Sequence, residues 1–122
     1  MESRNYTDNC QPEILMANLD KCTDGDTEFR RELAQLLANN ITEMIANIER
    51  SVKVKDPNIM MRSVHKTKTT LTILNDGEMN EEITIVEKKL KESSPIDLEI
   101  HVEKLISRCI KAVNALNALS AQ

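Results

Sequence analysis

The sequence predicts an all-α protein, an up-down-up-down antiparallel four-helix bundle with a short N-terminal capping helix. The 122 residues include one Phe, one Tyr and no Trp, so the core must be aliphatic, which favours helices over a β-sandwich or barrel. Only two glycines and three prolines occur, which implies few, long elements. Apolar residues recur at helical spacing in four long segments, and the short links between these segments favour antiparallel neighbours.

The chain is expected to be one domain, residues 1–122, because its length suffices for a single hydrophobic core. Residues 1–11 are polar and are interpreted as a mobile leader. Residues 12–22 should form a short helix that begins at Pro12 and packs across the bundle as a lid. The four-helix bundle then occupies residues 26–119.

The first bundle helix should be the longest. Asp26 is a suitable N-cap, and the apolar spacing predicts a helix from about Thr27 to Ser51, followed by a connector over residues 52–55. The apolar positions of this helix are Phe29, Leu33, Leu36, Leu37, Ile41, Met44, Ile45, Ile48 and Val52.

The second bundle helix should begin with Asp56 as N-cap and Pro57 at the first helical position, and should end at about Leu74. Residues 75–77 would stop it, with Gly77 in the left-handed conformation that helix ends often need. The buried stripe of this helix would consist of Met60, Val64, Leu71 and Leu74, with Thr67 among them.

The third bundle helix is expected to be capped by Asn80. The last helix should start at about Pro95, because Ser94 and Asp97 have the spacing of a capping box. The inward positions of these two helices are Ile83, Val86, Leu90, Leu98, Val102, Leu105, Cys109, Val113, Leu116 and Leu119.

Composition also excludes several classes of protein. The net charge of -4 argues against a nucleic-acid-binding surface. No apolar run approaches the roughly 18 residues of a membrane span, and the polar start does not resemble a signal peptide. The protein is therefore expected to be cytoplasmic. Cys10, Cys22 and Cys109 are expected to be reduced, and His101 to be a surface residue without a metal-binding partner.

The second bundle helix, residues 57–74, contains the residues that suggest a chemical function. His65 lies on the shoulder of the buried stripe, where its ring can meet solvent. This helix has no Asp or Glu, and its charged residues are Arg62, Lys66 and Lys68. A neutral imidazole among cations suits a nucleophile that accepts a phosphoryl group, and Lys68 on the same face could pair with phosphoryl oxygens. An ordinary half-exposed histidine is the alternative interpretation.

The pattern around His65 resembles the central helix of the histidine phosphotransfer (HPt) domains of multistep phosphorelays. The residues that carry the resemblance are His65-x-x-Lys68, followed by Thr70-Leu71 and Leu74. The four expected helices also match the order and approximate length of that family's bundle. Three positions depart from the family pattern, with Thr67 where the family usually has an apolar residue, and Thr69 and Asn75 where glycine is common. Thr69 is either tolerated by the partner or helps to hold the phosphoryl group.

The resemblance implies a phosphorelay intermediate. His65 would accept a phosphoryl group from the aspartyl phosphate of a response-regulator receiver domain and pass it to another receiver, with Lys68 steadying the phosphoryl oxygens. The partners would be receiver domains and hybrid histidine kinases, and the chain would act as a monomer. Without a glycine-rich phosphate loop, no ATP binding, cofactor or autonomous kinase activity is expected, and the divalent metal of such transfers would come from the partner.

Antiparallel pairing suggests which residues surround His65. Glu87, on the following helix, would lie level with the ring and could orient its other nitrogen. A docking surface for the partner would be formed by Met44, Met61, Asn40 and Asn47. Further candidates for contact with the phosphoryl group or the partner are Thr69, Thr72, Arg62 and Lys66.

Two other functions remain open from sequence. One is a helical adaptor that binds receiver or kinase domains without transferring phosphate, and its in vivo effect would survive replacement of His65 by glutamine. The other is a regulatory bundle unrelated to phosphorelays, which a buried His65 ring would favour.

Overall fold

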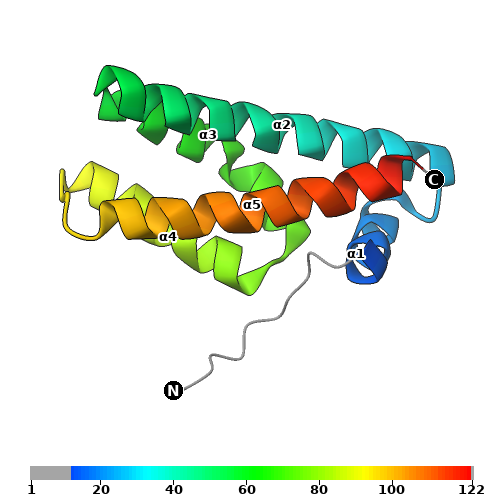
Figure 1. Ribbon diagram of the computed structural model, residues 1–122. Coiled ribbons are helices and arrows are strands. Elements are labelled where there is room, and N and C mark those ends of the chain that lie inside the picture. The colour runs from blue at the N-terminus through cyan, green and yellow to red at the C-terminus, as the bar shows by residue number, and fades with distance from the viewer. Residues whose placement is uncertain (1–11, 122) are drawn as a thin grey trace.

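The computed structural model describes residues 12–121, which form five helices packed together and contain no strand (Figure 1). The all-α class is therefore confirmed for this part of the chain, whereas the expected leader, residues 1–11, and Cys10 lie outside it. The helices are α1 (Pro12–Thr23), α2 (Thr27–Val54), α3 (Pro57–Leu74), α4 (Gly77–Lys91) and α5 (Leu98–Ser120).

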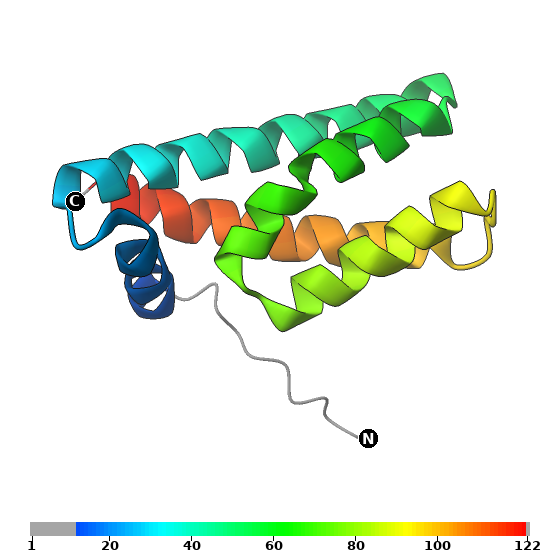
Figure 2. The same cartoon turned by 180° about the vertical axis from the view of Figure 1, so that it is seen from behind.

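The four longer helices contact one another in a closed cycle. Helix α2 packs against α3 and α5, and α4 packs against the same two helices. The two longest helices, α2 and α5, lie side by side in both Figure 1 and Figure 2. Helix α1 lies at the end of the molecule where α2 begins and α5 ends, and it contacts α2, α3 and α5. All five helices therefore contribute to one packed unit.

The core is aliphatic, as composition indicates, and its central residues are fully buried. Three residues that the apolar spacing of α2 assigned to the core are instead exposed: Phe29 at 49%, Leu36 at 55% and Val52 at 64%. They lie at the margins of a broad apolar stripe, and α2 buries only the part that faces its neighbours. The largest fully buried side chains are Leu15, Leu19, Leu37, Ile41, Met44, Ile48, Leu71, Leu74, Met79, Ile83, Leu105 and Leu116.

The first two bundle helices begin at the expected caps. Asp26 accepts a hydrogen bond from the Phe29 backbone N–H at 3.0 Å, and Asp56 accepts one from the Asn58 N–H at 3.0 Å. Helix α2 continues to Val54, beyond the expected end at Ser51. Most of the expected connector over residues 52–55 is thus helical, and Lys55 closes the helix with a φ of 57°.

The turn between α3 and α4 differs from the expectation. Asn75, with a φ of 55°, adopts the left-handed conformation that the sequence predicts for Gly77. Asp76 then caps α4 by accepting a hydrogen bond from the Met79 N–H at 2.9 Å, and Gly77 is the first residue of that helix. The helix ends at Leu74 and is stopped within residues 75–77, as expected, but the left-handed residue is Asn75 instead of Gly77, and the expectation that Asn80 caps the next helix is wrong. Asparagine tolerates the left-handed region well enough to end a helix without glycine.

The start of α5 also differs. The helix begins at Leu98 rather than Pro95, and Asp97 makes no side-chain cap hydrogen bond. Ser93 and Asp97 have φ values of 52° and 59°, so the backbone turns at both positions. The capping box at Ser94 is therefore wrong, because Pro95 lies inside this turn and not in the first turn of a helix.

Candidate functional site

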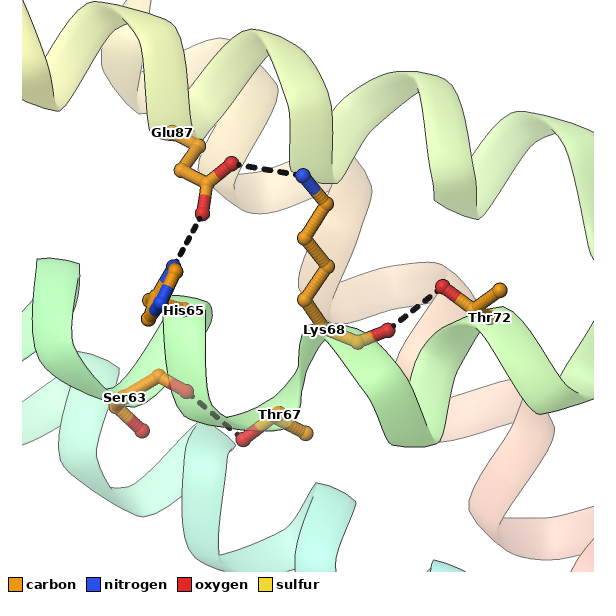
Figure 3. Close-up of polar contacts among 6 residues, drawn as sticks. All are labelled: Ser63, His65, Thr67, Lys68, Thr72 and Glu87. Atoms are coloured by element: carbon orange, nitrogen blue, oxygen red, sulfur yellow. Dashed lines mark hydrogen bonds and ion pairs between the residues drawn. The ribbon is translucent and has the colours of Figure 1, made fainter.

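The imidazole of His65 projects from the middle of α3 and is accessible to solvent. Its side chain is 74% exposed, although Val64 beside it is fully buried. Glu87 of α4 reaches the ring, with Oε2 3.1 Å from Nδ1 of His65 (Figure 3). The expected proximity of these two residues is thus present in the structure.

Glu87 binds a second residue of α3. Nζ of Lys68 donates a hydrogen bond to Oε1 of Glu87 at 3.1 Å, so one carboxylate joins the histidine and the lysine (Figure 3). The Glu87 side chain is only 8% exposed, whereas that of Lys68 is 47% exposed. A buried acceptor therefore holds two more exposed side chains in a defined arrangement.

The surroundings of Glu87 favour its ionised form. Burial alone would raise the pKa of Glu87, but this effect is outweighed by the hydrogen bonds from His65 and Lys68 and by the charges of Lys68 and Lys91. The pKa of Glu87 consequently lies below its ordinary value. A carboxylate is thus present beside the ring at neutral pH.

The hydrogen bond to Glu87 determines which nitrogen of His65 is available. An ionised carboxylate only accepts hydrogen bonds, so the proton of a neutral His65 ring belongs on Nδ1. The lone pair is then on Nε2, the nitrogen that Glu87 does not occupy. In its neutral form the exposed ring therefore presents Nε2 as a nucleophile, and the carboxylate that contacts its Nδ1 also holds the ammonium group of Lys68.

Thr69 and Thr72 follow His65 on α3, and both are exposed. The Thr72 hydroxyl donates to the backbone carbonyl of Lys68 at 2.9 Å, so it serves the helix backbone rather than the His65 ring (Figure 3). Thr67 is buried and donates to the carbonyl of Ser63 at 2.8 Å. This bond explains how a threonine occupies a position in the buried stripe.

Arg62 and Lys66 are not part of the cluster formed by His65, Lys68 and Glu87. Both are exposed, and together with Arg50 they border a hollow of about 350 Å³ beside α2. Nζ of Lys66 lies 3.6 Å from a carboxylate oxygen of Glu43, and both side chains are well exposed. Asp56 also lines this hollow, so the surface there is basic in balance, with three cations and one carboxylate among its lining residues.

The expected docking residues differ in their surroundings. Met44 is fully buried, so the expectation that it adds apolar surface is wrong; its place on the helical stripe directs it into the core. Met61 is partly exposed. Asn40 donates to the hydroxyl of Thr70 and Asn47 to that of Ser63, each at 3.3 Å, so these two residues join α2 to α3.

Sequence reasoning overlooked two features. Lys91 lies one helical turn after Glu87, and this spacing of four residues could have identified it as a neighbouring charge. His101, expected at the surface, has a side chain only 21% exposed, and its Nδ1 lies 2.6 Å from Oε2 of Glu82. His101 thus has a carboxylate partner as His65 has, but its ring is far less accessible.

Comparisons with known proteins gave no match to a protein-family model, a curated protein or a solved structure. Among residues 12–121, no helix has the length and apolar character needed to cross a membrane. The same residues contain no group of three or more His, Cys, Asp or Glu side chains placed to hold a metal ion.

Proposed function

We propose that this chain is an HPt-like phosphorelay intermediate. His65 takes a phosphoryl group from the aspartyl phosphate of a receiver domain and passes it to another receiver. The observation that carries the proposal is a single arrangement: an exposed imidazole whose Nδ1 is held by a buried carboxylate, which also holds Lys68. A buried ring would instead have favoured a bundle unrelated to phosphorelays.

The transfer step follows from the tautomer of His65. The Nε2 lone pair attacks phosphorus and forms the N–P bond, while the bond from phosphorus to the aspartyl oxygen of the receiver breaks and the carboxylate leaves. No proton has to move, because Nδ1 keeps its hydrogen. The ring becomes formally cationic as the bond forms.

Glu87 and Lys68 stabilise the two charges of the phosphorylated ring. The ionised Glu87 lies against the Nδ1–H side, where positive charge develops on His65. Lys68 uses one of its three N–H donors for Glu87, and the others remain for the oxygens of the phosphoryl group. The reverse transfer uses the same contacts, so the step is reversible.

The proposal includes the topology of the family that the sequence resembles. We infer an antiparallel up-down-up-down four-helix bundle formed by α2 to α5, with α1 as its cap. The closed cycle of helix contacts and the short links on either side of α3 support this arrangement.

Receiver domains and hybrid histidine kinases are the proposed partners. A receiver's acidic pocket, which supplies its own divalent metal, would meet the basic surface of Arg62 and Lys66 next to His65. The protein would act as a cytoplasmic monomer, in which Met61 and Thr69 lie close enough along α3 to touch the partner.

A phosphotransfer assay tests the proposal. A phosphorylated receiver domain is mixed with wild type, with His65→Gln and with the matched control His101→Gln, and the products are analysed by mass spectrometry. Wild type and His101→Gln should gain an acid-labile, alkali-stable phosphoryl group, and His65→Gln should gain none. Binding to several receivers without transfer to wild type would instead identify the chain as a non-transferring adaptor.

A further inference from the structure

An apolar groove lies between α2 and α5, and Met60 of α3 also contributes to its lining. It has a volume of about 590 Å³. The side chains at its base and sides are mostly apolar, and several of them are partly exposed. The apolar residues that line it are Ile48, Val52, Met60, Pro95, Leu98, Val102 and Ile106.

Exposed apolar side chains lie both in this groove and beyond its end. Val52, on the α2 side, is 64% exposed, and Ile110, one turn beyond Ile106 on the same flank of α5, is 49% exposed. The lining residues of α5 run from Leu98 to Ile106, roughly 12 Å along the axis at about 1.5 Å per residue. A segment of two to three helical turns would match this length.

Every charged residue that lines the groove is acidic. Glu49 lies on the α2 side, and Glu99 and Glu103 lie on the α5 side, with no lysine or arginine among the lining residues. Carboxylates therefore border the apolar floor on both sides. The ligand that complements this pattern is apolar along its centre and basic along both edges.

We propose that the groove between α2 and α5 binds an amphipathic helix of a partner protein whose apolar face is flanked by lysine or arginine. Apolar side chains at positions i, i+3, i+4 and i+7 would enter the groove. The basic side chains beside them would pair with Glu49, Glu99 and Glu103. A helix bordered by acidic residues would be rejected, because like charges would face each other.

The groove shares no residue with the proposed phosphoryl acceptor, because Met60 is its one lining residue from α3 and neither His65, Lys68 nor Glu87 lines it. The pair α2 and α5 faces the viewer in Figure 1, whereas α3 and α4, which carry His65 and Glu87, lie in front in Figure 2. A helix in the groove would leave His65 accessible. The proposal therefore holds whether or not His65 accepts a phosphoryl group.

The experiment measures binding of a synthetic helical peptide by fluorescence anisotropy to the full chain. The probe has about 14 residues, about 21 Å as a helix, with leucines at the four anchor positions and lysines on both flanks. Its matched control replaces the lysines by glutamates. The basic peptide should bind, the acidic one should not, and binding should weaken at about 1 M salt, where the Debye length is about 3 Å.

Three variants locate the peptide. Val52→Asp in the groove should weaken binding by about tenfold or more, and Glu99→Lys should weaken it and make it less sensitive to salt. Ile100→Asp, an exposed control outside the lining residues, should bind as wild type does.

Equal binding of both peptides, or wild-type affinity of Val52→Asp, would overturn the proposal. So would a dimer in sedimentation that Val52→Asp dissociates, since a second copy would then be the occupant. His65→Gln should bind the peptide as wild type does, which separates this test from the phosphotransfer assay.

Discussion

At the scale of single residues, the contact between Glu87 and Nδ1 of His65 can be tested for its effect on the proposed phosphotransfer. In Glu87→Gln, a neutral amide replaces the carboxylate, and its NH₂ group can donate to Nδ1 and draw the ring proton to Nε2. Loss of a hydrogen bond to a charged group costs about 1.5–3 kcal/mol, so transfer to His65 should slow by roughly ten- to a hundredfold. The rate of phosphorylation measures this effect.

The tautomer of His65 gives a second measurement for Glu87→Gln. Nitrogen chemical shifts of the neutral ring should show the proton on Nδ1 in wild type and a larger share on Nε2 in the variant. A ring whose shifts do not change would mean that Glu87 does not control the tautomer. The slower transfer would then need another cause.

The lowered pKa of Glu87 predicts a pH dependence of stability. The ordinary pKa is 4.5, and the folded protein lowers it, so the ionised residue stabilises the fold fully above the unfolded pKa. This contribution is lost as the pH falls through the folded pKa. Urea unfolding of wild type and Glu87→Gln from about pH 7 to pH 3 should therefore show a difference that shrinks with acid. A difference that grew with acid would contradict the assignment.

Residue-level prediction from the sequence succeeded where helical geometry alone decided the outcome. The exposed position of His65 and the facing position of Glu87 follow from the spacing of residues on two neighbouring helices. Met44 was wrongly expected on the docking surface, because helical spacing alone does not distinguish a methionine in the core from one at the margin of the core. The hydrogen bond between Nζ of Lys68 and Glu87 depends on rotamers, which the sequence does not specify.

At the scale of helices, the buried N-cap of α4 should contribute more to stability than the exposed N-cap of α2. Asp76 is fully buried, caps α4 and pairs with Arg108 of α5. Asp76→Ala removes both contacts and leaves the charge of Arg108 less compensated. The free energy of unfolding should therefore fall by about 3–5 kcal/mol. Chemical denaturation followed by circular dichroism measures this loss.

Asp26→Ala is the matched control for this prediction. Asp26 also accepts a hydrogen bond from a helix N-terminus, but it is exposed. Removing this cap should lower the free energy of unfolding by only about 1 kcal/mol. Equal losses in the two variants would show that Arg108 adds nothing to the role of Asp76.

Helix interiors were predicted better than helix ends. The interiors follow from a repeating apolar pattern, which several residues support at once. The ends depend on single residues, and the sequence offers more than one candidate, as with Asn75 and Gly77 for the end of α3. The turn before α5 has left-handed backbone at Ser93 and Asp97. Serine does not indicate this conformation, and aspartate, which tolerates it, is also common at helix N-caps.

At the scale of the whole molecule, the question is whether α1 unfolds together with the other four helices as one cooperative unit. Leu15 and Leu19 of α1 are fully buried, and α1 contacts α2, α3 and α5. A lid that opened independently would not share its buried residues with the common core. Leu19→Ala should therefore destabilise the entire protein by about 2–5 kcal/mol, in a single unfolding transition.

Hydrogen exchange in α5 provides a second test of whether α1 unfolds together with the bundle. If α1 belongs to the cooperative unit, Leu19→Ala should speed the exchange of the slowest amides of α5 to the same extent as it lowers the global free energy of unfolding. The control Leu36→Ala removes a side chain that is 55% exposed and should change stability by less than about 0.5 kcal/mol. Faster exchange in α1 alone would show that α1 is a detachable cap and that α2 to α5 form the stable unit.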